Sequence, residues 1–137
     1  MSNAIILIAR ILLSFMFVLS GFMKLTDPAG TAGMIAGAGL PAATLLAYVA
    51  GLFELLAGLA VLTGFQVRIA GWLLAGFCVF TAVAFHLPYA SGAELLNILN
   101  QIMVMKNITL AGAYILLATV GAGAYSIDAR RGAYATA

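Results

Sequence analysis

Apolar residues fall into four long stretches, which cover about residues 4–25, 41–64, 67–89 and 103–123. An α-helix rises about 1.5 Å per residue, so each stretch is long enough to cross the hydrocarbon layer of a membrane, which is roughly 30 Å thick. The first stretch carries Arg10 within it and has no cleavage site after it, unlike a secretory signal peptide, and we expect it to be retained. The pattern therefore predicts an all-α integral membrane protein, a four-helix bundle.

Two of the predicted connections are long enough to hold a helix of their own. After the first span, Asp27 and Pro28 suit the start of a helix and Gly39 suits its end. Between the third and fourth spans, residues 91–101 (SGAELLNILNQ) space leucine and isoleucine among polar residues, as in a helix that lies on a membrane surface. We therefore predict a short interfacial helix in each of these two outer connections.

Composition narrows the class of protein further. Of the 137 residues, 65% are hydrophobic and 7% are charged, against about a quarter charged in a soluble domain. The net charge of +2 is not gathered into a Lys/Arg cluster, so we expect no nucleic-acid partner. With one cysteine, Cys78, and one histidine, His86, we predict no metal site and no dithiol chemistry. One membrane domain, residues 1–137, accounts for the length.

Basic residues predict how the bundle is oriented in the membrane. Four spans place both termini, and the turn between the second and third spans, on one side. The four arginines belong to that side and the two lysines to the other: Arg10, Arg68, Arg130 and Arg131 against Lys24 and Lys106. Because cytoplasmic loops carry an excess of Lys and Arg, we predict a multi-pass protein of the bacterial inner membrane with both termini in the cytoplasm.

Each predicted span has one helical face of polar or small residues, and we expect these four faces to line the interior of the bundle. In chain order they are Arg10, Ser14, Phe17, Gly21 and Lys24; Ala50, Glu54 and Gly58; Arg68, Trp72, Ala75, Val79, Ala82 and His86; and Asn107, Ala111, Tyr114, Ala118 and Gly121.

Arg10 and Glu54 are the charges that lie deepest in the predicted spans. An unpaired charge near the middle of a membrane costs about 2.5–3.5 kcal/mol on insertion scales, so we predict that the two face the interior and interact, directly or through water. An ionisable residue inside a membrane is also a functional candidate by default. The alternative for Glu54 is a structural pair with Arg10 that sets the register of the helices.

A second polar group maps near the outer boundary of the membrane: Lys24, His86, Tyr89, Glu94, Lys106 and Asn107. Two ammonium groups and an imidazole could bind an anion, donate to a quinone carbonyl or transfer protons. The alternatives are interfacial anchoring by the lysines and a structural hydrogen bond by His86. The candidate catalytic residues are Glu54 and His86, and the candidates for binding a substrate or quinone are Arg10, Lys24, Lys106 and Asn107.

Several longer motifs follow one another in a defined order over nearly the whole chain. They are ARILLSFMFVLSGFMKLTDPAG near the start, GLP followed by FELLAGLAVLTGFQVRIAG, the histidine that ends the third span, and MKNITLAGAYILL followed by GAGAYSID. In these motifs the chain resembles the DoxX family of small four-helix bacterial inner-membrane proteins. The family pattern falls on Arg10, Gly21, Lys24, Glu54, Gly64, Arg68, His86, Lys106, Asn107, Gly112, Ser126 and Asp128. The chain departs from it at residues 121–123, where a GPG is common, and at Met105, where an aromatic is common.

The resemblance implies a link to quinone chemistry, because the family takes its name from association with a thiosulfate:quinone oxidoreductase. We hypothesise a subunit of a quinone-linked redox or oxidative-stress-related membrane complex, with no intrinsic cofactor and with a bound quinone. The alternatives are a noncatalytic assembly or anchoring subunit of a larger membrane complex and a small-solute carrier. Whether the chain is an enzyme stays open at this point. The expected partners are membrane lipid, a larger membrane complex or further copies of the chain.

Overall fold

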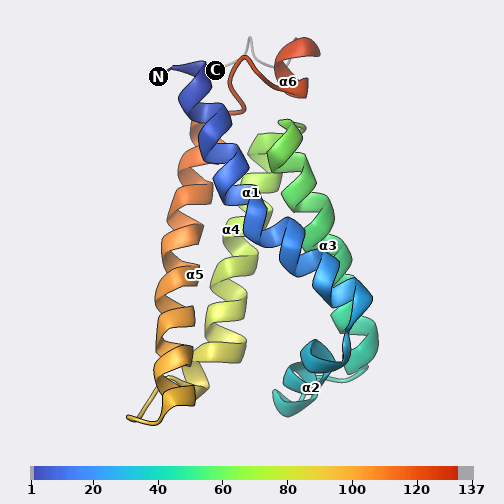
Figure 1. The fold of residues 1–137 in the computed structure, drawn as a ribbon, viewed down its shortest axis with the longest axis vertical. Coiled ribbons are helices and arrows are strands. Elements are labelled where there is room, and N and C mark those ends of the chain that lie inside the picture. Colours follow the sequence, from blue (N-terminus) through green and yellow to red (C-terminus); the bar gives the residue numbers. More distant parts are fainter. Residues whose placement is uncertain (1, 133–137) are drawn as a thin grey trace.

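The computed structural model describes residues 2–132, which form helices and their connections without any strand (Figure 1). The helices are α1 (Asn3–Thr26), α2 (Ala29–Gly37), α3 (Ala43–Thr63), α4 (Val67–Thr81), α5 (Leu95–Val120) and α6 (Ile127–Arg130). A π-helix, η1 (Ala82–His86), and a 3-10 turn, η2 (Leu87–Tyr89), continue α4. Within the described residues, four helical segments are long and apolar enough to cross a membrane. The predicted all-α membrane bundle is therefore confirmed.

The two predicted interfacial helices have different outcomes. The first is present as α2, which begins after Pro28. The second is not a separate helix, because α5 begins at Leu95 and runs without a break through the predicted fourth span. No glycine or proline interrupts residues 95–103, so nothing ends the first turns before the span begins. Every later residue of α5 therefore lies deeper along its helix than the sequence pattern indicates.

The bundle is built from two closely packed helix pairs, α1 with α3 and α4 with α5, and α2 packs mainly against α3. In the first pair the two backbones come into direct contact, since a Cβ atom on Gly21 would lie 2.5 Å from the Leu55 nitrogen. In the second pair a Cβ atom on Gly71 would lie 2.9 Å from the Tyr114 carbonyl oxygen. Small residues thus let each pair approach at backbone distance.

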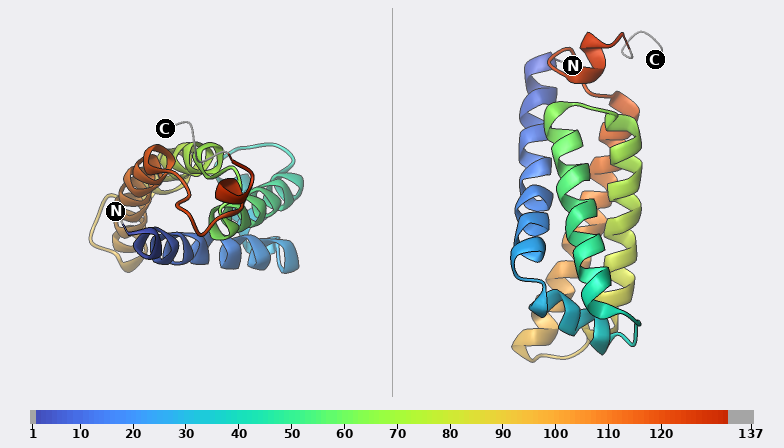
Figure 2. Two further views of the ribbon diagram at one scale, coloured as in Figure 1. Left: turned by 90° about the horizontal axis from the view of Figure 1, so that it is seen from above. Right: turned by 90° about the vertical axis from the view of Figure 1, so that its right-hand side faces the viewer.

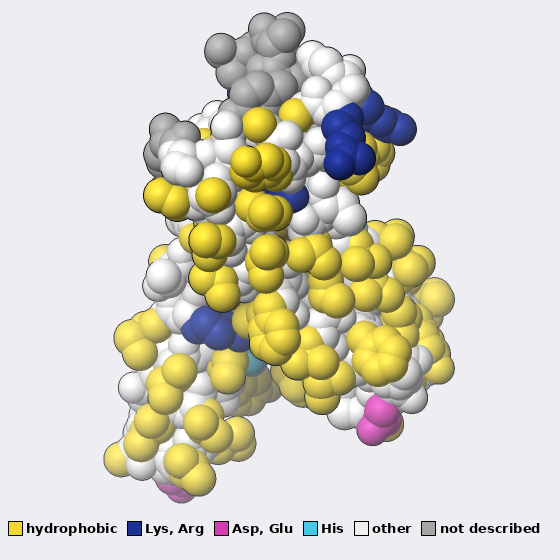
Figure 3. Space-filling view, turned by 45° about the horizontal axis from the view of Figure 1, so that its top comes forward, with side chains coloured by type: hydrophobic (Ala, Val, Ile, Leu, Met, Phe, Trp, Pro, Cys, Tyr) yellow, Lys and Arg dark blue, Asp and Glu magenta, His cyan; other side chains and the backbone are white. Residues whose placement is uncertain are grey.

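The pairs meet at one end of the molecule and diverge toward the other (Figure 1). We call the first the terminal end; it holds the start of α1, the turn between α3 and α4, and α6. The opposite end, which holds α2 and residues 90–94, is the loop end. Seen along the bundle, the segment between α5 and α6 crosses over the terminal end (Figure 2). The space-filling view shows apolar side chains over most of the visible surface and a hollow between the two pairs toward the loop end (Figure 3).

Three of the four predicted interior faces agree with the buried positions, and the face predicted for the third span agrees only in part, since Ala75 and Ala82 are buried and His86 lines the cavity described below. Trp72 on that face is 56% exposed, and Arg68 and Val79 are exposed as well. The buried residues of α4 are Val67, Ala70, Gly71, Leu74, Ala75 and Cys78. Apart from Arg68 and Thr81 near its two ends, α4 is apolar, so polarity does not mark its inner face. That face is the one on which Gly71 lets α5 approach.

Candidate functional site

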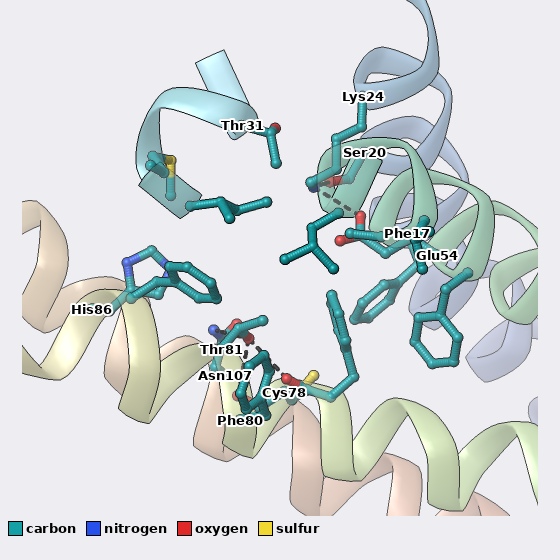
Figure 4. A pocket seen from close by; sticks show the side chains of 18 of the residues that line it. Phe17, Ser20, Lys24, Thr31, Glu54, Cys78, Phe80, Thr81, His86 and Asn107 are labelled. Carbon is teal, nitrogen blue, oxygen red and sulfur yellow. Dashed lines mark hydrogen bonds and ion pairs between the residues drawn. The ribbon is translucent and has the colours of Figure 1, made fainter. Parts of the chain in front are cut away.

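A cavity of about 480 Å³ lies between the two helix pairs (Figure 4). Residues from α1, α2 and α3 line one side, and residues from α4, η1 and α5 line the other. Most of the lining is apolar, including Phe17, Phe53, Phe77, Phe80 and Phe85. The polar lining residues are Ser20, Lys24, Thr31, Glu54, Thr81, His86, Lys106 and Asn107.

Aromatic contacts join the two helix pairs beside the cavity. The Phe17 ring lies 5.5 Å from that of Tyr114 and 6.2 Å from that of Phe77, both edge to face. The Tyr114 hydroxyl crosses between the pairs and donates to the Leu13 carbonyl at 2.7 Å. These contacts hold the two helix pairs together near the middle of the bundle. The cavity lies where the pairs diverge beyond these contacts.

Glu54 pairs with Lys24 on one wall of the cavity. The Lys24 Nζ lies 3.0 Å from the Glu54 Oε2 and also donates to the Ser20 Oγ at 2.6 Å. Lys24 belongs to the last turn of α1, but its ammonium group reaches back to a carboxylate midway along α3. The Glu54 side chain is 4% exposed and that of Lys24 is 21% exposed. The pair is therefore a largely buried one, in which each charge offsets the desolvation of the other.

Lys106 and Asn107 approach the cavity from the opposite wall. Asn107 is buried, and its Nδ2 donates to the Thr81 Oγ1 at 3.1 Å, which ties α5 to the end of α4. Lys106 is partly buried midway along α5. Among residues 2–132, no hydrogen bond or ion pair joins the Lys106 ammonium group to another residue. The cavity wall thus carries one lysine paired with a carboxylate and one without a protein partner.

His86 lies at the end of the π-helix that follows α4. Its Nδ1 is 3.0 Å from the Asn100 Oδ1, and the Asn100 Nδ2 donates to the Leu96 carbonyl. Since the amide nitrogen of Asn100 is already a donor, its oxygen accepts the Nδ1 hydrogen, and Nε2 of a neutral imidazole is left to accept a proton. A π-helical turn changes which side chains face inward, and such turns are frequent at functional sites.

Arg10 lies apart from the cavity, at the terminal end, and the predicted interaction with Glu54 is wrong. Arg10 is 1% exposed, and its guanidinium donates only to backbone carbonyls. The acceptors are Val61 at 2.9 Å, Leu62 at 2.8 Å, Ala122 at 2.6 Å and Tyr125 at 2.9 Å. The first two acceptors belong to the last turn of α3, where the carbonyls carry the negative end of the helix dipole. Carbonyl groups compensate this cation, and no carboxylate is needed in contact with it.

Residues near Arg10 to which the sequence assigned no role complete this end of the bundle. The Asp128 carboxylate accepts from the backbone nitrogens of Gln66 at 2.8 Å and Val67 at 3.0 Å, which satisfies the start of α4. Gly64 has a φ of +75°, and a Cβ atom there would overlap Ser126 and lie 2.9 Å from the Arg10 Nη1. All three residues belong to the family motifs quoted above: Gly64, Ser126 and Asp128. That membership is the signal in the sequence that could have pointed to their role at this end of the bundle.

The other predicted site residues divide between the cavity and its surroundings. Five of them line one cavity: Lys24, Glu54, His86, Lys106 and Asn107. Glu54 therefore lies with the residues predicted at the outer boundary, and it does not lie with Arg10. Tyr89 and Glu94 of that group are exposed and are not part of the lining. Sequence reasoning placed Phe17 on an interior face but missed Phe53, Phe77, Phe80 and Phe85, because single aromatic residues within apolar spans carry no visible pattern. Within residues 2–132, no three His, Cys, Asp or Glu side chains gather into a possible metal site.

Comparison with known proteins gives a consistent result. The family model described as DoxX matches residues 5–87, more than half of the chain. The inner membrane protein YqjF of Escherichia coli (strain K12) is 41% identical over 123 residues, which are 90% of this chain and 88% of YqjF. The inner membrane protein YphA of the same organism is 34% identical over 126 residues, 92% of this chain and 89% of YphA. No solved structure matches the chain.

Proposed function

The chain belongs to the DoxX family of integral membrane proteins, and from this premise we propose that it is the membrane subunit of a quinone-linked redox system that binds its quinone in the cavity. The observation that carries the proposal is the cavity itself, which combines phenylalanine rings with polar side chains, among them Glu54 and Lys106 midway along their helices. Its volume of about 480 Å³ falls in the range of about 300–1,000 Å³ that is usual for small-molecule sites.

The lining suits a lipid-soluble molecule with a planar head. Phe17, Phe53 and Phe77 offer ring faces and edges, which pack well against a flat conjugated ring. Lys24 and Lys106 are donors that could hold carbonyl oxygens. Glu54 and the Nε2 of His86 are groups that could give or take a proton at those oxygens. Arg10 is left out of the proposed binding residues, since four carbonyls already use its guanidinium.

The quinone would supply the group that accepts and releases electrons, and a partner in a larger membrane complex would exchange those electrons with it. The role of this chain in the proposal is to bind and orient the head group and to exchange protons with it. Membrane lipid surrounds the chain, and a second copy is an alternative neighbour to a larger complex.

Photo-cross-linking tests the proposal directly. An azido-quinone is illuminated with the full-length protein in nanodiscs, and the labelled peptides are identified by mass spectrometry. We expect labels on cavity-lining segments of α1, α4 and α5, with competition by unlabelled quinone. Phe17→Leu should reduce the labelling, and Phe15→Leu is the matched control, because Phe15 is on the same helix but 68% exposed. Labelling that unlabelled quinone does not displace, or that is equal in both variants, would contradict the proposal.

An assembly or anchoring role is the second candidate, and two outward-facing glycines favour it. Gly76 on α4 and Gly112 on α5 are exposed, and a Cβ atom on either would have no neighbour within 4 Å. Such positions allow a helix of another protein to approach closely. Under this alternative, Gly76→Leu and Gly112→Leu would abolish copurification of a partner, whereas Glu54→Gln would leave it unchanged.

We also propose that the chain lies in the bacterial inner membrane with both termini in the cytoplasm. The location is supported by the two relatives, which are both named as inner membrane proteins. The orientation is supported by the exposed arginines Arg68, Arg130 and Arg131 at the terminal end, while the exposed acids Asp27 and Glu94 lie at the loop end. Alkaline phosphatase fused to the carboxyl terminus should be inactive in cells; an active fusion would contradict the orientation.

A further inference from the structure

We infer that the molecule bound in the cavity carries an acidic group, which is held in its ionised form by Lys106. The inference rests on the proposed function only in assuming that the cavity binds a lipid-soluble molecule. It adds the chemical class of that molecule, an amphiphile with an apolar body and an anionic head. A quinone bearing an acidic hydroxyl and a long-chain carboxylic acid both belong to this class.

The charges on the cavity wall do not balance. The lining contains two lysines, Lys24 and Lys106, and one carboxylate, Glu54. Glu54 is committed to Lys24 at 3.0 Å. Among the described residues no second acid lines the cavity, since Asp27 and Glu94 are exposed elsewhere at the loop end. One positive charge therefore faces the cavity without a counter-ion, and an anionic ligand would supply it.

The depth of Lys106 argues against an anchoring role at the membrane surface. Because α5 begins at Leu95, Lys106 follows the start of its helix by eleven residues, which corresponds to about 17 Å along the axis. A lysine at the end of a span can extend its ammonium group to the lipid head groups. Lys106 lies midway along the helix instead, and its side chain lines the cavity. The sequence pattern had placed this lysine near a helix end, where anchoring would explain it.

The remainder of the lining suits the body of such an amphiphile. Besides the phenylalanines, the cavity is lined by aliphatic residues of α2 and α3 such as Ile35, Leu46 and Val49. Close to Lys106, the Asn107 amide and the Thr81 hydroxyl already bond each other, so among the described residues Lys106 is the cationic group of this wall that is free to bind an anionic head group. An ionised head at Lys106 would thus leave the apolar body among the phenylalanine and aliphatic side chains.

Four probes separate this inference from the proposed quinone function. They are a 2-hydroxy-3-alkyl-1,4-naphthoquinone, its neutral 2-methoxy ether, a long-chain fatty acid and the fatty alcohol of the same length. Binding is measured by equilibrium dialysis against the full-length protein in zwitterionic nanodiscs, at a mildly alkaline pH at which both acids are ionised. Protein-free nanodiscs correct for partition into lipid. We expect each acid to bind about tenfold more tightly than its neutral partner.

Three variants test whether Lys106 is the cause. Lys106→Met keeps an unbranched side chain, one atom shorter, without the charge, and the acid and its neutral partner should then bind about equally tightly. Lys106→Arg should retain the preference for each acid. Arg68→Gln is the control, because Arg68 is exposed outside the cavity; it should bind like the parent protein. Gel filtration and thermal unfolding confirm that each variant is folded before binding is compared.

The outcomes identify which idea fails. Equal binding of acid and neutral partner, or a preference that persists in Lys106→Met, would overturn the inference, while binding of the methoxy quinone would still support the proposed function. Preference for the fatty acid over the alcohol without binding of either quinone would support the inference and contradict the quinone function. If none of the four probes binds, both are overturned.

Discussion

The two ends of the molecule bury positive charge in different ways. At the terminal end the Arg10 guanidinium is held by four backbone carbonyls and does not line the cavity between the helix pairs. At the loop end the helix pairs diverge, and the charges of Lys24, Glu54 and Lys106 line a cavity that phenylalanines surround. The first arrangement is complete without a ligand, whereas the second leaves one lysine without a counter-ion. Buried charge in a membrane protein therefore indicates a binding site only where the fold leaves it uncompensated.

The largest effect is expected from removing the charge at the terminal end. Arg10→Met removes the side-chain donor of four carbonyls, of which Val61 keeps a second donor in the Gly64 backbone nitrogen. Each unsatisfied buried group costs about 1–3 kcal/mol. Partial relaxation should limit the total loss in the free energy of unfolding to about 4–5 kcal/mol. Reversible unfolding in mixed micelles measures it, with exposed Arg68→Met as control. A loss below about 1 kcal/mol would contradict the view that Arg10 joins α1, α3 and the segment before α6.

A smaller loss is expected from separating the helix pair that forms one wall of the cavity. In Gly21→Ala the added methyl group would meet the backbone of α3 at Leu55 and Gly51, so α1 must move away. We expect a loss of about 2–3 kcal/mol, the cost of overpacking. Gly112→Ala is the matched control, because a Cβ atom there meets nothing within 4 Å, and it should be neutral or slightly stabilising. Equal melting temperatures for the two variants would refute the close α1–α3 contact.

The smallest effect is expected at the ion pair of the loop end. Glu54→Gln retains the shape and one acceptor but leaves Lys24 without a counter-ion, and we expect a loss of about 1–2 kcal/mol. Adding Lys24→Met should recover most of that loss, because the unpaired cation is then gone. A double-mutant cycle of unfolding free energies measures the coupling. If the losses of Glu54→Gln and Lys24→Met simply add in the double variant, the 3.0 Å contact contributes no coupling energy. Arg10 would then be the buried charge that stabilises the fold, in contrast to the Lys24–Glu54 pair.

A feature could be predicted from the sequence where it belongs to a single segment, and was predicted poorly where it depends on contacts between segments. Span lengths depend on hydrophobicity summed over about 20 residues, and all four spans were predicted. The interior face of α1 was also predicted, because Arg10 and Ser14 mark it with polarity. The face of α4 was predicted only in part, since the charged residue that it carries, Arg68, lies on the exposed side and no polar residue marks the buried side. Partners of charges were predicted least well, because Arg10 binds carbonyl groups that every residue possesses.

The sequence by itself determined that this is a four-span membrane protein, since hydrophobicity and helix length are properties of each segment alone. It also singled out the ionisable residues that must be buried, because a charge within an apolar span has no other favourable location. Only the tertiary structure decided how these charges are compensated. Backbone contacts at Gly21 and Gly71 set the helix pairs, and their divergence brought Lys24, Glu54 and Lys106 to one cavity while Arg10 was enclosed at the other end. The distances between these charged side chains depend on how the helices pack against one another, which no single segment determines.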